Sequence, residues 1–293
     1  MRSQSKIAIA VAVLALLTTF KSNGRVQAEE VEAMRILAAR QLDKALQVAE
    51  SAGDPAEQIA ILKAAASETR RKMPSNVLVQ EVLGRFEQPK SNADGSLFKE
   101  WRAAIIEARD ILRFEPLVEA PLPDGFPTPT PVGEIQVQHY PKYRQAYTEM
   151  TLIEGRAFLT LFNHIQRREI AMTAPVEMTY AFTGGSVLKK SRMSFLYRST
   201  DQGELGNQGK VQVVDIPAQM ALSMGIRGEA TIETIKDAKR RLEDWLKTHD
   251  NEYEAAGALR VMGYNSPFVS NSKRCTEVQL PVTAKQQRSA ITR

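Results

Sequence analysis

The side chains that could carry out chemistry are few and widely spaced in this sequence of 293 residues. It contains three histidines, His139, His164 and His249, and one cysteine, Cys275. A single cysteine excludes an intrachain disulfide, a CxxC redox pair and a cysteine-based zinc site. A lone histidine cannot supply the three protein ligands of a catalytic zinc ion, so the histidines do not predict one.

Serine and glycine patterns give no support for catalysis either. Ser186, Ser191 and Ser194 do not lie in a Gly-x-Ser-x-Gly turn, which positions the nucleophile of many hydrolases. The glycines between residues 203 and 209 separate expected strands and do not open a helix, so we do not expect them to bind a phosphate. No acid–base pair stands out, and we expect that the protein is not an enzyme.

Two short segments with a proline are the most distinctive features of the sequence. They are residues 168–176 (REIAMTAPV) and residues 263–268 (GYNSPF). Each follows an amphipathic helix and lies at an apolar strand. Proline cannot donate a hydrogen bond to a central ladder, so we expect Pro175 and Pro267 at equivalent strand breaks, at edges or bulges. The pair indicates a duplicated strand–helix–strand unit.

The elements that position these segments follow one order twice between residues 133 and 283. In each half, strands precede and follow a helix; Phe158, Leu161 and Phe162 form the apolar face of the first helix, and Thr231 is expected to cap the second. Strands are expected over residues 135–140, 143–152, 170–178, 180–183, 192–198, 211–216, 220–226, 258–264 and 277–282. The predicted fold class is α+β, in which the duplicated units form a distorted β-barrel flanked by two helices, preceded by an N-terminal helical module.

The same region resembles the SOUL haem-binding family. The matching stretches are residues 139–144 (HYPKYR), 158–165, 170–176 (IAMTAPV), 194–197 (SFLY) and 263–268 (GYNSPF). The resemblance implies a distorted β-barrel with two helices, which binds haem or another tetrapyrrole in a shallow apolar cleft near the first helix. Family members do not share one iron ligand. The last strand departs from the family pattern, because residues 273–278 read KRCTEV where two basic residues are usually followed by Asn-Glu-Val.

The resemblance implies a set of candidate cofactor-binding residues, which are His164, His139, Phe158, Phe162, Met172, Arg167 and Arg168. His164 is the candidate haem-iron ligand, because imidazole commonly binds haem iron. Each residue type in this set also has a more common role that involves no cofactor. A histidine at a helix edge is often solvated or hydrogen-bonded, and a methionine often fills a core. Arginines at a helix end often complement the helix dipole, whereas here they could instead pair with porphyrin propionates.

The N-terminus has the pattern of a secretory signal peptide. Arg2 and Lys6 precede an apolar run over residues 7–20, and Ala28 is the expected cleavage site. The alternative is an uncleaved membrane anchor, although a membrane-spanning helix needs roughly 20 apolar residues. Cleavage leaves 35 basic against 34 acidic residues, because the four charged residues of the leader are all basic. A net charge of +1 gives no reason to expect a nucleic acid partner.

The chain therefore divides into five expected segments. They are a signal peptide (1–28), a helical module (29–114), a Pro-rich linker (115–132), the SOUL-like domain (133–283) and a polar tail (284–293). The linker either spaces two domains or lies along the surface of one. We expect an exported protein, periplasmic or secreted, that sequesters or transports a porphyrin-type molecule and has no stable membrane span after cleavage. The alternative is an interaction scaffold in which residues 29–114 dock a protein partner.

Overall fold

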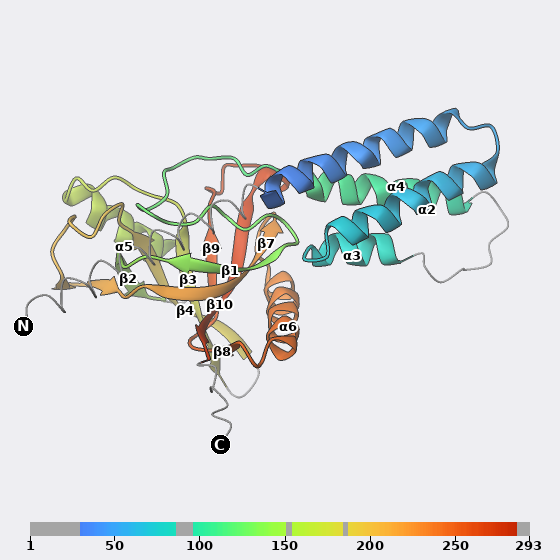
Figure 1. Cartoon of the computed structure of the whole chain (residues 1–293). Helices are drawn as coiled ribbons and strands as arrows, with labels where there is room; N and C mark the ends of the chain where they lie inside the picture. The colour runs from blue at the N-terminus through green and yellow to red at the C-terminus, as the bar shows by residue number, and fades with distance from the viewer. Residues whose placement is uncertain (1–29, 86–95, 151–153, 184–186, 286–293) are drawn as a thin grey trace, which may run out of the picture. The chain divides into compact units, whose positions relative to one another are not determined.

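The computed structural model describes residues 30–85, 96–150, 154–183 and 187–285 (Figure 1). They form two compact units, and each is described by itself. The N-terminal unit comprises the described residues up to Pro74 and from Val79 to Arg113. The C-terminal unit comprises Ser75–Leu78 and the described residues from Phe114 onward. The predicted signal peptide and most of the predicted tail lie outside the described residues.

The N-terminal unit is helical, as predicted. Residues 30–51 are helical, and they are followed by α2 (Pro55–Lys72), α3 (Val77–Gly84) and α4 (Ser96–Leu112). The side chain of Asp54 caps α2, whose first residue is the proline expected there. Apolar residues at helical spacing meet in one core, which includes Ala38, Leu42, Leu62, Val82, Leu83, Ile105 and Leu112.

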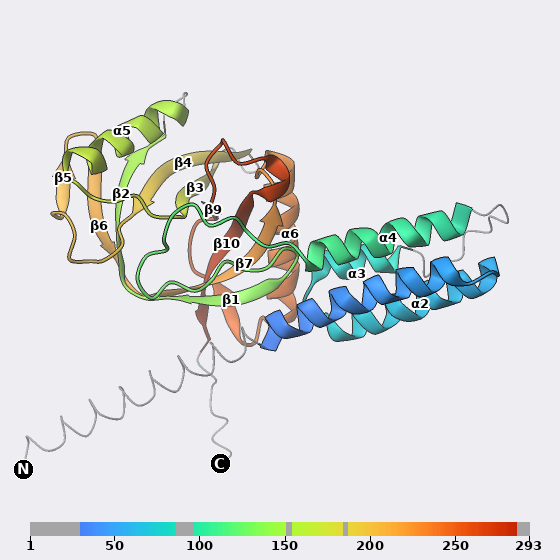
Figure 2. The ribbon, with the colours of Figure 1, turned by 90° about the horizontal axis from the view of Figure 1, so that it is seen from above.

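The C-terminal unit is a ten-stranded antiparallel sheet with helices on one side (Figures 1 and 2). Its helices are α5 (Glu154–Arg167) and α6 (Ile232–Thr248), with a short 3-10 turn, η1 (Asn271–Lys273). Its strands are β1 (Ile135–Tyr140), β2 (Tyr143–Glu149), β3 (Val176–Thr183), β4 (Val187–Leu196), β5 (Gly206–Gln208), β6 (Val211–Ile216), β7 (Gln219–Arg227), β8 (Tyr253–Ala255), β9 (Arg260–Gly263) and β10 (Cys275–Ala284). The α+β class is therefore confirmed.

The strand order has the symmetry that a duplicated unit requires. It reads β1-β7-β10-β9-β3-β4-β2-β6-β5, with β8 beside β10. The two halves meet where β9 pairs with β3, and on either side of this pair each half has the same succession of strands. The first strand of each half pairs with the other half, because β1 lies against β7 and β6 lies against β2.

The predicted distorted β-barrel is wrong, because the sheet stays open. A barrel closes only when its two edge strands pair, and the edges here are β1 and the three-residue β5. The sheet instead covers two separate apolar clusters. One lies against α6 and includes Leu222, Ile235 and Leu242, and the other lies against α5 and includes Leu161 and Phe195. Each half packs against its own helix, and Met178 of β3 contacts both clusters.

The two prolines lie outside the strands but are not equivalent. The strand predicted over residues 170–178 begins only at Val176, so Pro175 immediately precedes β3. Pro267 follows the end of β9 at Gly263. The lack of an N–H explains why neither is within a ladder. The capping prediction for α6 is confirmed, because the Thr231 hydroxyl accepts a hydrogen bond from the Thr234 N–H at 3.2 Å.

The two faces of the sheet differ in chemistry. Since neighbouring side chains on a strand point to opposite faces, one face carries the apolar residues beneath α5 and α6. The other face carries polar residues, among them Glu177, Arg260 and Glu277. Residues 117–132, which we call the strap, run along this polar face. Ala174 N–H donates to the carbonyl oxygen of Pro121, and Asp124 N–H donates to that of Arg198.

Candidate functional site

The predicted site residues on α5 lie at the edge of an apolar cluster. Leu161 and Ile165 face the sheet and are buried, whereas Phe158 and Phe162 are only half-buried. The two rings stack with centroids 6.0 Å apart and planes 13° apart. Phe158 also meets Phe195 edge-on at 5.1 Å, so its position is set by the core beneath it.

Met172 is half-buried as well. It comes from the irregular segment between α5 and β3 and packs against the same cluster as Phe158 and Phe162. We call these three residues the apolar rim. Three predicted residues thus pack against one apolar cluster, and each keeps part of its surface open to solvent.

His164 is buried, with 6% of its surface exposed. Its Nε2 lies 2.8 Å from the hydroxyl oxygen of Tyr197, within hydrogen-bonding distance. Burial lowers the pKa of His164, and the nearby charges of Arg168 and Arg167 lower this pKa further. The imidazole is therefore neutral at neutral pH, which metal ligation needs, but one ring nitrogen already has a partner.

Arg167 and Arg168 are exposed at the C-terminal end of α5. Neither side chain forms an ion pair with any residue that the structure describes. Both are close enough to His164 to act on its pKa. Two free guanidinium groups therefore stand near the buried imidazole, and each can accept a carboxylate in a paired hydrogen-bond geometry.

The structure does not bring the other histidines to this place. His139 is exposed on the edge strand β1, opposite Met220 of β7, whereas α5 packs against β2, β4 and β6. His249 stacks on Trp245, with ring centroids 3.7 Å apart. Within the described ranges no three His, Cys, Asp or Glu side chains gather as a metal site.

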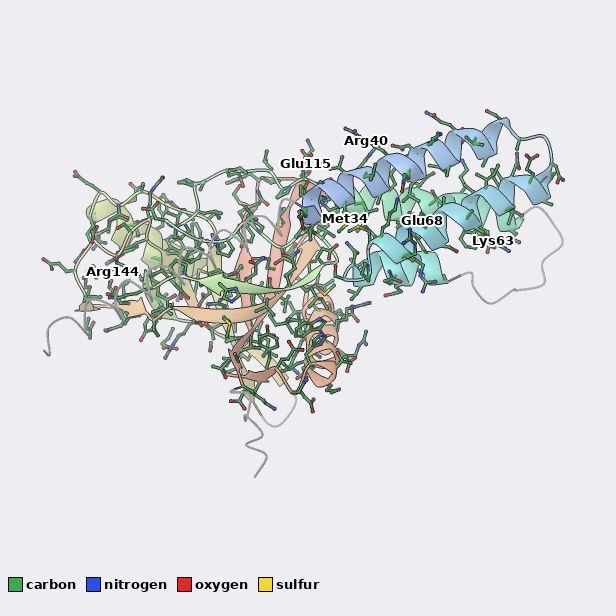
Figure 3. All side chains as sticks on the ribbon, viewed as in Figure 1. Met34, Arg40, Lys63, Glu68, Glu115 and Arg144 are labelled. Atoms are coloured by element: carbon green, nitrogen blue, oxygen red, sulfur yellow. The ribbon has the colours of Figure 1, made fainter. Side chains whose placement is uncertain are left out.

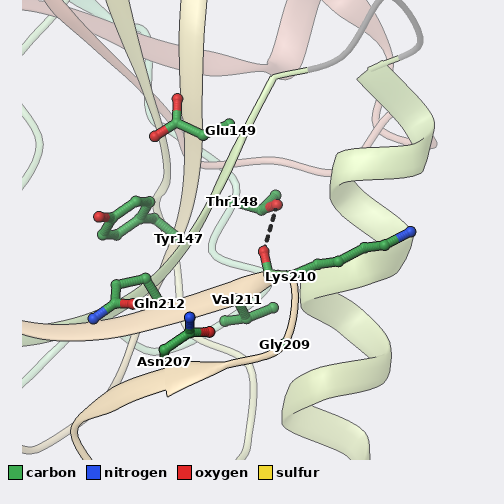
Figure 4. A pocket seen from close by; sticks show the side chains of 8 residues that line it. All are labelled: Tyr147, Thr148, Glu149, Asn207, Gly209, Lys210, Val211 and Gln212. Carbon is green, nitrogen blue, oxygen red and sulfur yellow. Dashed lines mark hydrogen bonds between the residues drawn. The ribbon is translucent and has the colours of Figure 1, made fainter.

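A small hollow lies beside the hairpin of β5 and β6 (Figure 4). Tyr147, Thr148 and Gln212 are among the residues that line it, and the Thr148 hydroxyl donates to the carbonyl oxygen of Lys210 at 2.9 Å. Its volume of about 200 Å³ is below the 300–1,000 Å³ typical of ligand pockets. None of the predicted site residues lines it, and it is too small to enclose a tetrapyrrole.

The polar face of the sheet holds a buried network that the sequence analysis missed. Glu277 on β10 is fully buried and accepts hydrogen bonds from Thr130 N–H at 2.6 Å and from the Ser223 hydroxyl at 3.0 Å. The Tyr264 hydroxyl and the Gln279 side-chain amide donate to the other carboxylate oxygen. Four donors thus replace the water that a buried carboxylate loses.

Arg260 on β9 is the cation of this network. Its Nη1 is 3.5 Å from Oε2 of Glu177 and donates to the Tyr143 hydroxyl at 3.1 Å, while Nε donates to Gln279 at 2.8 Å. Its guanidinium carbon lies 4.8 Å from the centre of the Tyr140 ring. Burial disfavours its charge, but Glu177 and the tyrosines outweigh burial and raise the pKa of Arg260.

The tyrosines of the network act as neutral hydrogen-bonding groups. Burial raises the pKa of Tyr140 and Tyr264, and the charge of Glu277 raises it further. Burial and Glu177 do the same for the pKa of Tyr143. The alternation of polar residues on β3 and β10 was the available sequence signal. Such alternation ordinarily indicates a solvated face, so the sequence did not reveal that the strap buries it.

The C-terminal unit is therefore an α+β domain with two helices on one face of an open antiparallel sheet and a covered polar network on the other. The family model described as SOUL heme-binding protein matches residues 129–281. This match spans more than half of the chain. The chain belongs to the SOUL haem-binding protein family.

Comparisons with solved structures find distant likenesses to this chain. The crystal structure of the EcmrR C-terminal domain is 17% identical, with a TM-score of 0.39, over 51% of this chain and 97% of that chain. An uncharacterized conserved protein from Listeria innocua is 12% identical, with a TM-score of 0.42, over 53% and 94%. SAV2435 bound to tetraphenylphosphonium is 11% identical, with a TM-score of 0.33, over 51% and 94%. These likenesses are too distant to support any statement about binding.

Among curated proteins, no sequence matches this chain significantly. In the part of the chain that the structure describes, every helix is too short or too polar to cross a membrane.

Proposed function

We propose that the C-terminal unit binds haem or another tetrapyrrole at the apolar rim and releases it chemically unchanged. The observation that carries this proposal is that the half-buried apolar rim and the exposed guanidinium groups of Arg167 and Arg168 all lie along α5 and the segment that follows it. Membership of the SOUL haem-binding family supports the same ligand class.

The described residues fit the periphery of a porphyrin better than its iron. Phe158, Phe162 and Met172 offer apolar surface, whose burial against a macrocycle contributes roughly 25 cal/mol per Å². Arg167 and Arg168 would hold the propionates as charge-assisted pairs. His164 could reach iron through Nε2 only after Tyr197 gives up its hydrogen bond, so the affinity rests on the rim and the arginines.

Hemin titration of the full chain, followed by the Soret band, tests this proposal. We expect saturable binding that weakens by about tenfold or more in the double variant Arg167→Ala/Arg168→Ala, because each lost charge-assisted bond costs ~1.5 kcal/mol or more. Arg156→Ala is the matched control, since Arg156 is exposed on the first turn of the same helix. His164→Ala should retain binding.

Three results would count against this site. They are the absence of a saturable Soret shift, an equal loss of affinity in Arg156→Ala, and a full loss of binding in His164→Ala with an intact fold.

The expectation that the tetrapyrrole is released unchanged has its own measurement. Tetrapyrrole recovered after prolonged incubation and separated by chromatography should be unmodified, and accumulation of product over several turnovers would contradict it.

A second candidate function is protein docking by the N-terminal unit. The helix over residues 30–51 exposes four large apolar side chains, Met34, Ile36, Leu37 and Val48, at 45%, 40%, 50% and 46% of their surface. Met34 is labelled in Figure 3. Exposed apolar groups on one helix are typical of interaction surfaces. Affinity capture with the full chain, compared with Met34→Ser/Leu37→Ser, should lose a specific partner that Arg40→Ser retains. An unchanged set of captured proteins would refute docking at this helix.

We also propose export, on the basis of the signal-peptide pattern over residues 1–28. N-terminal sequencing of the protein purified from its source cells should begin at Glu29. A mature protein that begins at Met1 would contradict the proposal.

A further inference from the structure

The two distinctive motifs of the sequence both hold the strap, residues 117–132. In the first motif, Ala174 N–H donates to Pro121 O at 3.0 Å. In the second, the Asn265 side chain donates to Leu117 O at 2.7 Å. The Ser266 N–H and hydroxyl donate to Glu119 at 2.6 and 2.9 Å. Neither motif contains a reactive group, and the structure accounts for them as anchors of one extended segment.

The strap contacts the polar face through an aromatic side chain and through backbone and hydroxyl groups, as a bound peptide does. Its Phe126 ring stands edge-on to Tyr140 and Tyr143, with centroids 5.0 and 5.1 Å apart. Thr130 N–H is bound by the buried carboxylate of Glu277 at 2.6 Å, and the Thr130 hydroxyl by Ser223 at 2.9 Å. An aromatic ring is thus recognised by two tyrosines, and the backbone by side chains of the sheet.

Five of the 16 strap residues are proline, at positions 121, 123, 127, 129 and 131. Proline favours the extended polyproline conformation and removes the N–H groups that would bind a segment into a sheet. Domains that recognise proline-rich peptides use aromatic grooves and a few polar contacts to such preformed chains. The contacts of the strap have this character, although donor and groove belong to one chain.

The contacts at the two ends of the strap differ in solvent exposure. At the C-terminal end the attachment is buried, since Gly133 N–H donates to Gly225 O and Val132 is almost fully covered. At the other end, Glu119, Asn265 and Ser266 are in contact with solvent. The exposed contacts open first, because water can replace each of their hydrogen bonds as they break.

The polar face also has hydrogen-bonding capacity that the strap leaves unused. Arg260 Nη2, Ser194 Oγ and Gln145 Oε1 are buried and have no hydrogen-bond partner among the described residues. Ser194 lies opposite Glu177 in the β3–β4 register, and Glu177 Oε2 is 3.5 Å from Arg260 Nη1. Gln145 is two residues from Tyr143 on the same face of β2. A proline-rich segment whose carbonyl groups or side chains reach these atoms gains hydrogen bonds that the strap does not make.

We propose that the polar face of the sheet is a recognition groove for an extended, proline-rich segment that contains a phenylalanine. In the isolated chain the strap occupies this groove. A segment of the same chemistry from a partner protein displaces the strap. A second copy of this chain is the weaker occupant. The strap of the second copy would first have to leave its own, identical groove. Exchange of straps between two copies would then form the same contacts that were broken, with no gain in binding free energy. The proposal does not depend on haem binding.

The test uses the full chain and a synthetic peptide of residues 121–132, PLPDGFPTPTPV, capped at both ends. Glu119→Gln weakens the exposed anchor, and Glu115→Gln removes the same charge four residues away (Figure 3). We expect the peptide to bind Glu119→Gln about tenfold more tightly than the wild-type chain or Glu115→Gln. A peptide with Phe126→Ala should lose this binding. Ser266→Ala, which weakens the same anchor from the other side, should behave like Glu119→Gln.

Acetylation of tyrosines by N-acetylimidazole, read by mass spectrometry, reports opening without any peptide. Tyr143 should react several-fold faster in Glu119→Gln than in Glu115→Gln. Tyr180, buried on the opposite face against the α6 cluster, should be unchanged and serves as the reference.

Three results would overturn the proposal. They are equal peptide affinity in Glu119→Gln and Glu115→Gln, binding that ignores the Phe126 ring, and acetylation of Tyr143 only as fast as that of Tyr180. A strap-exchanged dimer in sedimentation, without peptide binding, would assign the groove to a second copy and overturn the partner assignment.

Discussion

Glu277 is the residue on which the polar face depends most. It is fully buried, and its two oxygens accept hydrogen bonds from the strap, from β7, from Tyr264 and from its own strand. A glutamine at position 277 would replace one carboxylate oxygen by an NH2 group. That group would face N–H and O–H donors and could not accept their hydrogen bonds. Glutamine, although isosteric, should therefore not replace Glu277 without a loss of stability.

We expect Glu277→Gln to lower the free energy of unfolding by about 2–4 kcal/mol, because it leaves buried donors unsatisfied. Urea unfolding of the full chain measures this loss. Glu254→Gln, at an exposed position on β8, is the control and should change the stability by less than ~0.5 kcal/mol. Equal stability of the two variants would show that the carboxylate is not held as described.

Asp215 on β6 makes a contribution to stability that depends on pH. Hydrogen bonds from Arg144, at 2.7 Å, and from Lys142 lower the pKa of Asp215 to about 2. In the unfolded chain an aspartate has a pKa of about 3.9. Because the folded pKa is the lower one, the stabilising contribution is complete above pH ~4 and disappears as the pH falls towards about 2.

Asp215→Asn should therefore be less stable than the wild-type chain at pH 7, by about 1 kcal/mol. The difference should shrink to nearly zero as the pH approaches ~2. Thermal unfolding between these pH values checks both statements. Asp250→Asn, an exposed substitution with the same charge change, should show a small difference that does not depend on pH in this way. A constant difference for Asp215→Asn would refute the linkage.

At the scale of elements, close approach of the strap to β7 depends on one glycine. A Cβ on Gly225 would lie 2.1 Å from the Thr130 carbonyl oxygen and 2.4 Å from that of Pro131. Both are backbone atoms, so they cannot move aside as a flexible side chain could. The hydrogen bond from Gly133 N–H to Gly225 O ties the strap to β7 at the same place.

Gly225→Ala should accordingly lower the free energy of unfolding by at least about 2 kcal/mol and raise the solvent exposure of the strap. Urea unfolding and limited proteolysis near residue 130 measure the two effects. Gly263→Ala is the matched control on β9, because its Cβ would meet only Val176 O, at 3.8 Å. If both variants were equally stable, the strap would not be seated against β7.

The elements also show how far strand patterns can be used. The periods of β1, β6 and β7 and the cap of α6 were recognisable from the sequence, because alternation and Thr231 are local signals. The start of β3 was not. Residues 170–175 are apolar like a strand, but Thr173 and Ala174 use their polar groups on β4 and the strap. In residues 170–175, contacts with β4 and with the strap take the place of the hydrogen bonds between neighbouring strands.

At the scale of the whole molecule, the C-terminal unit includes a segment from the helical part of the chain. Ser75–Leu78 cluster with residues from 114 onward. Val77 N–H donates to Gly133 O at 2.8 Å, and the Asn76 side chain donates to Val132 O at 2.9 Å. Asn76 and Glu134 are both fully buried. The boundary of the unit is therefore not a single point in the sequence.

A fragment of residues 114–293 should melt roughly 5–10 °C below a fragment of residues 75–293. The shorter fragment lacks Ser75, whose hydroxyl donates to Glu134, and Asn76, whose side chain donates to Val132 O. Thermal unfolding followed by near-ultraviolet circular dichroism measures the difference. Asn76→Ala in the full chain tests the same contacts without truncation and should lower the stability of the C-terminal unit. Equal melting of the two fragments would contradict this assignment.

The sequence by itself determined the class of the domain, its internal repetition and its family. These depend on local periodicity and on motifs that are contiguous in the chain. The rim residues Phe158, Phe162 and Met172 were named through the family resemblance, and the structure packs all three against one apolar cluster.

Only the tertiary structure decided what surrounds each face of the sheet. It left the sheet open instead of closed, paired His164 with Tyr197, and buried Glu277 beneath a strap more than 140 residues earlier in the chain. Alternation along a strand fixes which residues share a face, but the same pattern serves a face covered by water and one covered by another segment. That choice depends on contacts between residues distant in sequence, which no local pattern records.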